Sequence, residues 1–342
     1  MSEDEEQGEL FAPLTLIERR LVASPAAAGF APTDELLFQH TVLCQASLPY
    51  RNPGDGCREW ERRNGHALLE ISAGKALHPE QERFVPIGLP YGPKPRLILS
   101  HLNAEALRTG KPEIEVEASL TAFIKRVGLD ANGHTIRTVK DQLTRLAAAT
   151  VRLGVLSADA HMKRARQSDI KLVEEFELWW PKDERQRVLW PGFVRLSPTY
   201  FESLQRHAVP LHPDALAALS HSAMGLDIYA WLAQRLHRIP QGEPQLVPWK
   251  ALKDQFGWHY GAMYKFRQVF NDTMRQVLSQ YPGARNAIEA DARGLTLRHA
   301  PPPVLSRKSP VVRGGRRLVD DKTTPPTDTP PALIEDRTGP DA

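Results

Sequence analysis

The chain has 342 residues, of which 41% are hydrophobic and 25% are charged, the composition of a globular protein with room for two domains. Its net charge is +3, but five acidic residues and no basic one lie within the first nine positions, so the rest of the chain carries +8. No apolar run is long enough to span a membrane, and Cys44 and Cys57 form no CxxC pair, which argues against a disulfide or zinc scaffold. We therefore expect a soluble, cytoplasmic protein with reduced thiols and no metal or other cofactor.

The two ends of the chain differ in composition from the body. Residues 1–32 begin with an acidic run and continue through an alanine-rich piece, and we expect a flexible acidic leader there. Residues 301–342 contain nine of the 29 prolines and lack an apolar pattern, so we expect a disordered Pro-rich tail. The body between them is predicted to form two domains, residues 33–190 and residues 191–300.

The first domain shows a helix, a strand, two further helices and a hairpin in chain order. Apolar residues spaced three and four apart define the helices, with Ser119 as a cap and Gly128 as a stop. The predicted elements are a helix at 95–109, a strand at 113–116, a helix at 119–127, a long helix at 135–153 and a hairpin with strands at 151–156 and 170–180. This is the order of a winged helix-turn-helix.

The same order recurs in the second domain. The predicted elements are helices at 223–238, 248–256 and 262–280, a strand at 246–247 and a hairpin with strands at 287–290 and 295–298. Because the spacing from helix to helix is kept, the two copies support each other. The sequence therefore predicts an α+β, mostly helical fold with tandem winged helix-turn-helix domains and small β-hairpin wings.

In a winged helix-turn-helix, the helix after the turn enters the DNA major groove, so its solvent face supplies candidate binding residues. Residues 134–168 contain seven basic and two acidic residues, an excess that favours DNA. An ordinary solvated helix face carries the same residue types, and this alternative stays open. The candidates in the first domain are polar residues of the long helix and basic residues of the hairpin tip: His134, Arg137, Thr138, Lys140, Asp141, Thr144, Arg145, Arg152, Lys163, Arg164 and Arg166.

The long helix of the second domain supplies a second set of candidates, opposite an apolar stripe that contains Phe266, Val269 and Phe270. Gln and Asn side chains can pair with adenine, and Arg with guanine, which gives such a helix sequence preference. A polar helix face without DNA contacts would have a similar composition. The candidates are Tyr264, Lys265, Gln268, Asn271 and Arg275.

Signatures of nucleotide and metal enzymes are missing from the sequence. It has no GxxxxGK[ST] phosphate loop and no pair of histidines with helical metal-ligand spacing. The His-hydrophobic-His triplet of rolling-circle origin nickases is absent as well. We therefore expect a binding protein rather than an enzyme.

Several short motifs occur one after another along the body of the chain. Residues 88–129 read GLPYGPKPRLILSHLNAEALRTGKPEIEVEASLTAFIKRVGL, with PYG, PRL, L..EA.RT and SL..F....G blocks. The flanking motifs are LPYRNPGDG at 48–56, WERRNG at 60–65, FVRLSPTYF at 193–201 and LDIYAWLAQR at 226–235. Over roughly residues 38–237, the chain resembles the plasmid-encoded RepA replication initiator family. It departs at DQLTRLAAAT (141–150), where the family often has a bulkier aromatic after RL, so we carry over no base contacts.

The resemblance implies a protein that binds repeated sites on double-stranded DNA at a plasmid origin and opens the nearby duplex. It also implies recruitment of the host replicative helicase, its loader or primase, and many such initiators repress their own gene. A homodimer is left open, and no membrane partner is expected. The main rival is a winged-helix transcriptional repressor without initiator activity, and an origin nickase has less support.

Overall fold

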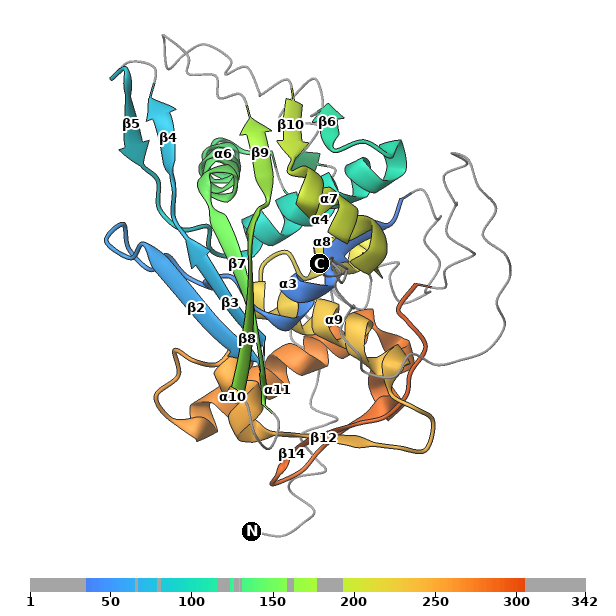
Figure 1. Cartoon of the computed structure of the whole chain (residues 1–342). Helices are drawn as coiled ribbons and strands as arrows, with labels where there is room; N and C mark the ends of the chain where they lie inside the picture. The colour runs from blue at the N-terminus through green and yellow to red at the C-terminus, as the bar shows by residue number, and fades with distance from the viewer. Residues whose placement is uncertain are drawn as a thin grey trace, which may run out of the picture. The chain divides into compact units, whose positions relative to one another are not determined.

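The computed structural model describes residues 35–304 except 65–66, 79–80, 116–123, 126–128, 130, 159–162 and 177–192. The described part has an α+β fold in which helices pack among several small antiparallel sheets (Figure 1). Its helices are α3 (Thr41–Gln45), α4 (Pro93–Thr109), α6 (Gly133–Ala148), α7 (Pro198–His207), α8 (Pro213–Ala218), α9 (Ala223–Arg235), α10 (Trp249–Phe256) and α11 (Met263–Gln280), with the 3-10 turns η3 (Leu236–Arg238) and η4 (Pro282–Ala287). The predicted leader and almost all of the predicted tail lie outside the described residues.

The strands are short, with the exception of one long hairpin formed by β7 and β8. They are β1 (Leu37–His40), β2 (Glu59–Asn64), β3 (Ala67–Ser72), β4 (Lys75–His78), β5 (Arg83–Pro86), β6 (Glu113–Glu115), β7 (Thr150–Ala158), β8 (Lys163–Lys171), β9 (Val173–Phe176), β10 (Phe193–Leu196), β11 (Ala208–Leu211), β12 (Gln245–Pro248), β13 (Ile288–Ala290) and β14 (Gly294–Leu297).

Helices α4 and α9 form the centre of the described body. Every residue of α4 from Pro95 to Ala106 is buried, and so is every residue of α9 from Ala223 to Gln234. A helix that is buried on all sides must be surrounded by other elements. Here α4 and α9 contact each other, α6 packs on α4, and α11 packs on α9. The two long helices α6 and α11 therefore each pack against one buried helix.

One ion pair joins the two central helices. The Nε of Arg96 in α4 lies 2.6 Å from one carboxylate oxygen of Asp227 in α9, and its Nη2 lies 2.8 Å from the other. The same guanidinium donates to the carbonyls of Gly92 and Leu48 at 2.6 and 2.8 Å. The side chains are only 4% and 9% exposed, so the charges are satisfied by each other and by the backbone rather than by water.

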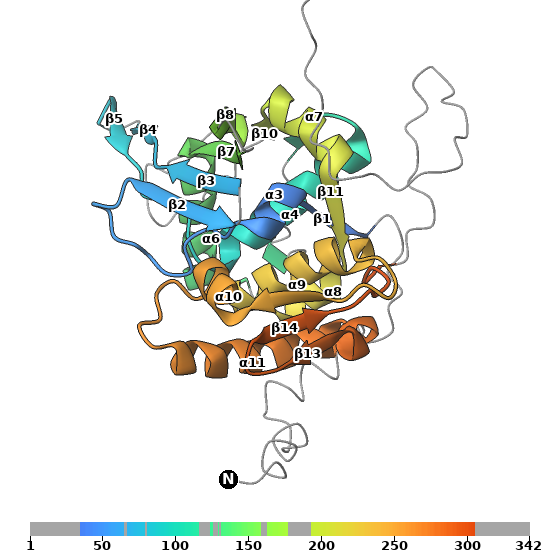
Figure 2. The same ribbon diagram turned by 60° about the horizontal axis from the view of Figure 1, so that its bottom comes forward.

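The body has a first half, from β1 to β10, and a second half, from α9 to β14. Each half contains a three-stranded antiparallel sheet, and the two sheets have equivalent strand orders. In the first half the order is β6-β10-β9, and in the second half it is β12-β14-β13. In both sheets the strand that follows the buried helix pairs with the last strand, and the last strand pairs with the one before it. Figure 2 shows the second sheet lying beside α11. The second copy of the predicted pattern is thus found element by element, from α9 through β12, α10 and α11 to β13 and β14.

The hairpin predicted after the long helix of the first half has a different partner from the one we expected. It exists as β7 and β8, but β7 pairs with β3, so these strands form a sheet of order β2-β3-β7-β8. The strands equivalent to β13 and β14 are β9 and β10 instead. The cause is the pairing of β7 with Leu69 and Ile71 of β3, both fully buried, about 80 residues upstream along the chain.

That pairing also shortens the long helix. We predicted it to reach Leu153, but α6 ends at Ala148, and Thr150 to Leu153 pair with β3. Strands β2 to β5 were not predicted, although Asn64 and Gly65 form a turn signal between two alternating runs. Of the helix predicted at 119–127, only residues 124–125 are described, and these are helical. The predicted boundary at residues 190 and 191 lies outside the described residues.

The buried ion pair gives a direct test of the core. Replacing Arg96 with leucine leaves the Asp227 carboxylate buried without a partner, and we expect a loss of about 3 to 5 kcal/mol in the free energy of unfolding. The double variant Arg96→Leu with Asp227→Leu removes both charges and should recover part of that loss. Denaturant unfolding of the full chain measures both. A loss below about 1 kcal/mol for Arg96→Leu would contradict this account.

Candidate nucleic-acid interface

The turn before α11 is set by a close contact at Gly257. The Gly257 N–H donates to the carbonyl of Lys253 at 2.8 Å and ends α10. A Cβ at Gly257 would lie 2.1 Å from the ring of Phe266, so only glycine lets α11 approach this closely. Phe266 is fully buried and contacts Phe270 with ring centroids 5.4 Å apart. The local sequence thus fixes the angle at which α11 leaves the turn.

The outer face of α11 carries the side chains predicted for it. Tyr264 is 67% exposed, and the other four candidates on this helix, Lys265, Gln268, Asn271 and Arg275, are exposed as well. Arg275 forms an exposed ion pair with Asp272 one turn before it. Val269, which we placed on the apolar stripe, is 36% exposed, because it lies at the edge of the stripe formed by Phe266, Phe270, Met274 and Val277. The exposure of this face is confirmed, and DNA contact stays a prediction.

A cluster of aromatic rings and one arginine contacts the turn before α11. The guanidinium of Arg62 on β2 lies 3.6 Å from the ring centroid of Trp60 and 4.5 Å from that of Trp258. The two tryptophan rings meet edge to face at 4.6 Å. Burial lowers the pKa of Arg62 to about 10. This contact, which no sequence pattern indicated, ties the β2-β3-β7-β8 sheet to the turn.

Helix α6 presents a shorter free face than we predicted. His134 and Arg137 are exposed near its start, which Asn132 caps by accepting from the Thr135 N–H at 2.9 Å. The hydroxyls of Thr138 and Thr144 donate to carbonyls of their own helix, at 2.9 and 3.0 Å.

Lys140 is half-buried on the same helix, and this burial lowers the pKa of its ammonium group. Of the predicted residues of α6, His134 and Arg137 are therefore the basic ones most available to a ligand.

Arg145 is held inside the protein rather than displayed on the helix face. Its side chain is 13% exposed, and its Nε lies 2.8 Å from both carboxylate oxygens of Asp141, one turn earlier. Its Nη1 donates to the carbonyl of Leu89 at 3.3 Å, and its guanidinium lies 5.3 Å from the ring centroid of Tyr91. These partners from the segment before α4 could not be inferred from the helical periodicity. Arg145 and Asp141 thus tie α6 to that segment.

Arg152 does not lie on a helix, contrary to our prediction. It is a residue of β7, directly opposite Glu70 of β3, and its guanidinium forms an ion pair with Glu70 and donates to the Ser72 hydroxyl at 2.9 Å. Lys163, Arg164 and Arg166 were predicted at a hairpin tip but lie within β8, opposite Ala158, Ser157 and Val155 of β7. The turn that joins the two strands, residues 159–162, lies outside the described residues.

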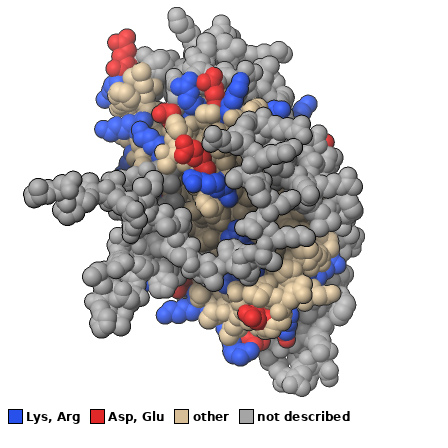
Figure 3. Space-filling view, turned by 45° about the vertical axis from the view of Figure 1, so that its right-hand side comes forward, with Lys and Arg blue, Asp and Glu red and all other residues tan. Residues whose placement is uncertain are grey.

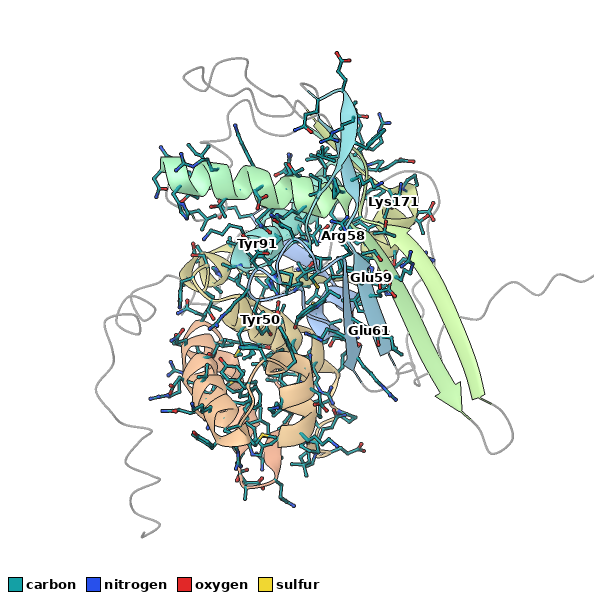
Figure 4. The ribbon with its side chains drawn as sticks, turned by 90° about the vertical axis from the view of Figure 1, so that its left-hand side faces the viewer. Tyr50, Arg58, Glu59, Glu61, Tyr91 and Lys171 are labelled. Atoms are coloured by element: carbon teal, nitrogen blue, oxygen red, sulfur yellow. The ribbon has the colours of Figure 1, made fainter. Side chains whose placement is uncertain are left out.

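On one face of the molecule, basic and acidic side chains of the described residues are mixed. Figure 3 shows Lys and Arg side chains spread over the upper and the lower part of one face, with Asp and Glu among them. In Figure 4, α6 and α11 both lie on the side that faces the viewer, with Tyr91 near the first helix and Tyr50 near the second. The candidates whose exposure the structure describes and that are exposed therefore lie on two separate helices, α6 and α11.

The described residues form neither a metal-binding group nor a membrane-spanning helix. Among the described residues, no group of three His, Cys, Asp or Glu side chains is placed to hold a metal ion. Of the helices that the structure describes, none is long and apolar enough to cross a membrane.

Comparison with known proteins places part of the chain in a family. Residues 89–251 match the family described as plasmid encoded RepA protein. Over this region the chain is similar to the plasmid-encoded RepA family. The family resemblance seen in the sequence is thereby confirmed over α4, α6, α9 and the first residues of α10, whereas α11 lies beyond the matched region.

The other comparisons add little to this assignment. A search of curated proteins found no match. The crystal structure of RctB domains 2-3 is 11% identical, with a TM-score of 0.45, and covers 74% of this chain and 84% of that one. A second structure of RctB domains 2 and 3, from selenomethionine derivatives, is 10% identical, with a TM-score of 0.47, and covers 72% and 87%. TM-scores below 0.5 do not establish a common fold.

Two arginines of α6, Arg137 and Arg145, allow a surface role to be distinguished from a structural role. We expect Arg145→Ala to lower the free energy of unfolding by about 1 to 3 kcal/mol, because it removes charged hydrogen bonds that hold α6 to the segment before α4. The matched variant Arg137→Ala, on the exposed face of the same helix, should leave unfolding nearly unchanged. Thermal unfolding of both variants is the measurement. Equal stability of the two variants would refute the structural role of Arg145.

Proposed function

We propose that the chain is a plasmid replication initiator that binds repeated double-stranded sites at its origin through two winged helix-turn-helix domains. In this proposal it promotes opening of the adjacent duplex and engages the host replicative helicase, its loader or primase. It acts as a DNA-binding protein without enzymatic activity. The observation that carries the proposal is the repeated sheet order, β6-β10-β9 and β12-β14-β13, attached to a RepA-family region.

In this proposal, the second half contains the more complete winged helix-turn-helix. Helices α10 and α11 meet at the Gly257 turn, and the three-stranded sheet follows, the arrangement of a helix-turn-helix with a wing. Helix α11 would enter the major groove, where Gln268 and Asn271 can pair with adenine, and Arg275 with guanine once it leaves Asp272. Tyr264 and Lys265 lie at the start of the helix, where backbone phosphates and base edges are both within reach.

The first half would use α6 in the equivalent position, with His134 and Arg137 toward the DNA. The long hairpin of β7 and β8 is inserted between α6 and the wing strands β9 and β10. Its basic residues Lys163, Arg164 and Arg166 lie close together along one strand and suit phosphates rather than bases. Two reading helices on one chain raise the affinity for repeated sites through effective concentration.

The α11 face can be tested on duplexes that the wild-type protein selects from a random pool. We expect Gln268→Ala, Asn271→Ala and Arg275→Ala each to weaken binding to the selected duplex by about 1 to 3 kcal/mol, if each residue pairs with a base. Binding to random duplex should change less. Arg206→Ala is the matched control, because Arg206 is an exposed arginine on α7. Equal losses on selected and random DNA would show that the face touches phosphates alone.

The basic strand of the long hairpin is expected to act through charge. Replacing Lys163, Arg164 and Arg166 with alanine should reduce the salt slope of binding by about 0.9 per lost phosphate contact, or roughly 2.7 in total. The effect should be the same on selected and random duplexes, because phosphates carry no sequence information. Dissociation constants across a salt series measure it, and an unchanged slope would remove the hairpin from the interface.

Two rival functions need separate assays. A transcriptional repressor with two winged helices would bind the same kind of site, but a plasmid that carries only this gene and its neighbouring repeats would not replicate. An origin nickase would cleave a strand of supercoiled origin DNA, whereas the proposed initiator leaves it intact. Replication of that minimal plasmid in a suitable host is therefore the deciding test.

A further inference from the structure

The β4-β5 hairpin exposes a pair of large apolar side chains. Leu77 and Phe84 are direct cross-strand partners, and they are 55% and 67% exposed. Lys75 and Pro86 form the next pair on that face, and both are exposed as well. The opposite face carries Ala76, which is 5% exposed. The hairpin thus has one face toward the protein and one free face that is apolar apart from Lys75.

The base of this hairpin is fixed rather than loosely attached. Arg58 donates from Nη1 to the carbonyl of Ile87 at 2.7 Å and from Nη2 to those of Ala73 and Gly74 at 2.8 and 2.7 Å. One guanidinium therefore holds the chain where it enters and leaves the hairpin, and Figure 4 labels Arg58 there. Such anchoring keeps Leu77 and Phe84 in water although no element of the described body covers them.

The position of the hairpin is also fixed relative to α6. A Cβ at Gly74 would lie 1.9 Å from the carbonyl oxygen of Ala148, so the chain enters β4 against the last turn of α6. Strand β4 contacts α6 as well. If α6 lies in a major groove, the hairpin begins where that helix ends and projects beside the same duplex. The hairpin therefore starts beside the C-terminal end of the helix proposed to bind DNA.

The chemistry of the free face selects among partners. Proteins that kink DNA insert Phe, Leu or Pro side chains between base pairs from the minor groove, next to basic residues that hold the phosphates. The free face offers Leu77, Phe84 and Pro86, and its one charged residue is the cation Lys75. Glu82 lies outside this face, in the turn, next to the oppositely charged Arg83.

From these observations we propose that the β4-β5 hairpin is a wedge that inserts Leu77 and Phe84 into the minor groove beside the site bound by α6. Insertion unstacks one base step and weakens the duplex next to the bound site. This inference rests on the proposed function, because it requires α6 to bind double-stranded DNA. It adds the element that would start the opening of that DNA.

The test uses the full chain and a duplex that the wild-type protein selects from a random pool. An adenine in each flanking base step is replaced in turn by 2-aminopurine, whose fluorescence rises when it is unstacked. We expect the wild type to raise the fluorescence at one flanking step, and Leu77→Ala with Phe84→Ala to lose that rise. The control Leu77→Ile with Phe84→Leu keeps the face apolar and should retain most of the rise.

The outcomes separate this inference from the proposed function. If the wild type selects no duplex, both are rejected. If it selects a duplex but raises no fluorescence, or the alanine variant keeps the full rise, the wedge alone is rejected. Sedimentation of the free proteins provides the remaining check: a smaller assembly for the alanine variant would show that the face binds a second copy of the chain, which also rejects the wedge.

Discussion

The ion pair between Arg96 and Asp227 is the constraint on which the rest of the fold depends. Apolar burial is non-directional, and side-chain packing limits two helices buried on every side only to a small set of crossing angles. A two-pronged contact between a guanidinium and a carboxylate has one geometry, and two backbone carbonyls hold the same guanidinium. A buried charge pair adds little net stability compared with apolar residues, but it penalises arrangements in which either charge is left unpaired. The pair thereby fixes α4 against α9.

The placement of the two outer helices, α6 and α11, depends on this ion pair. Helix α6 packs on α4, and α11 packs on α9, so the angle between the buried helices sets the relation between the exposed faces. A second link acts at the surface, where Arg62 stacks on Trp60 and Trp258 and joins the β2-β3-β7-β8 sheet to the turn before α11. Because β7 leaves directly from the end of α6, that sheet connects one exposed helix to the other.

The second half of the body could be predicted from sequence because its signals are local. Gly257, the apolar spacing of α11 and the short hairpin that follows it all act within a few residues of one another. The first half could not be predicted in the same way. Its strand β7 pairs with a strand about 80 residues upstream, and no local sequence pattern identifies that partner. The same reason explains the sites: the exposed face of α11 follows from its periodicity, whereas Arg145 and Arg152 are engaged by Leu89 and Glu70 from distant segments.

The β7-β8 hairpin and the β4-β5 hairpin are both additions to the repeated pattern, and both occur in the first half. The second half keeps the pattern without insertion, and its helix α11 carries the polar side chains suited to reading bases. A division of labour follows from this difference. Under the proposed function, the second half would choose the site, because the exposed face of α11 carries side chains of the types that distinguish base pairs. Under the proposed function, the first half would act on the DNA, because a basic strand and an exposed apolar pair suit phosphates and base steps of any sequence.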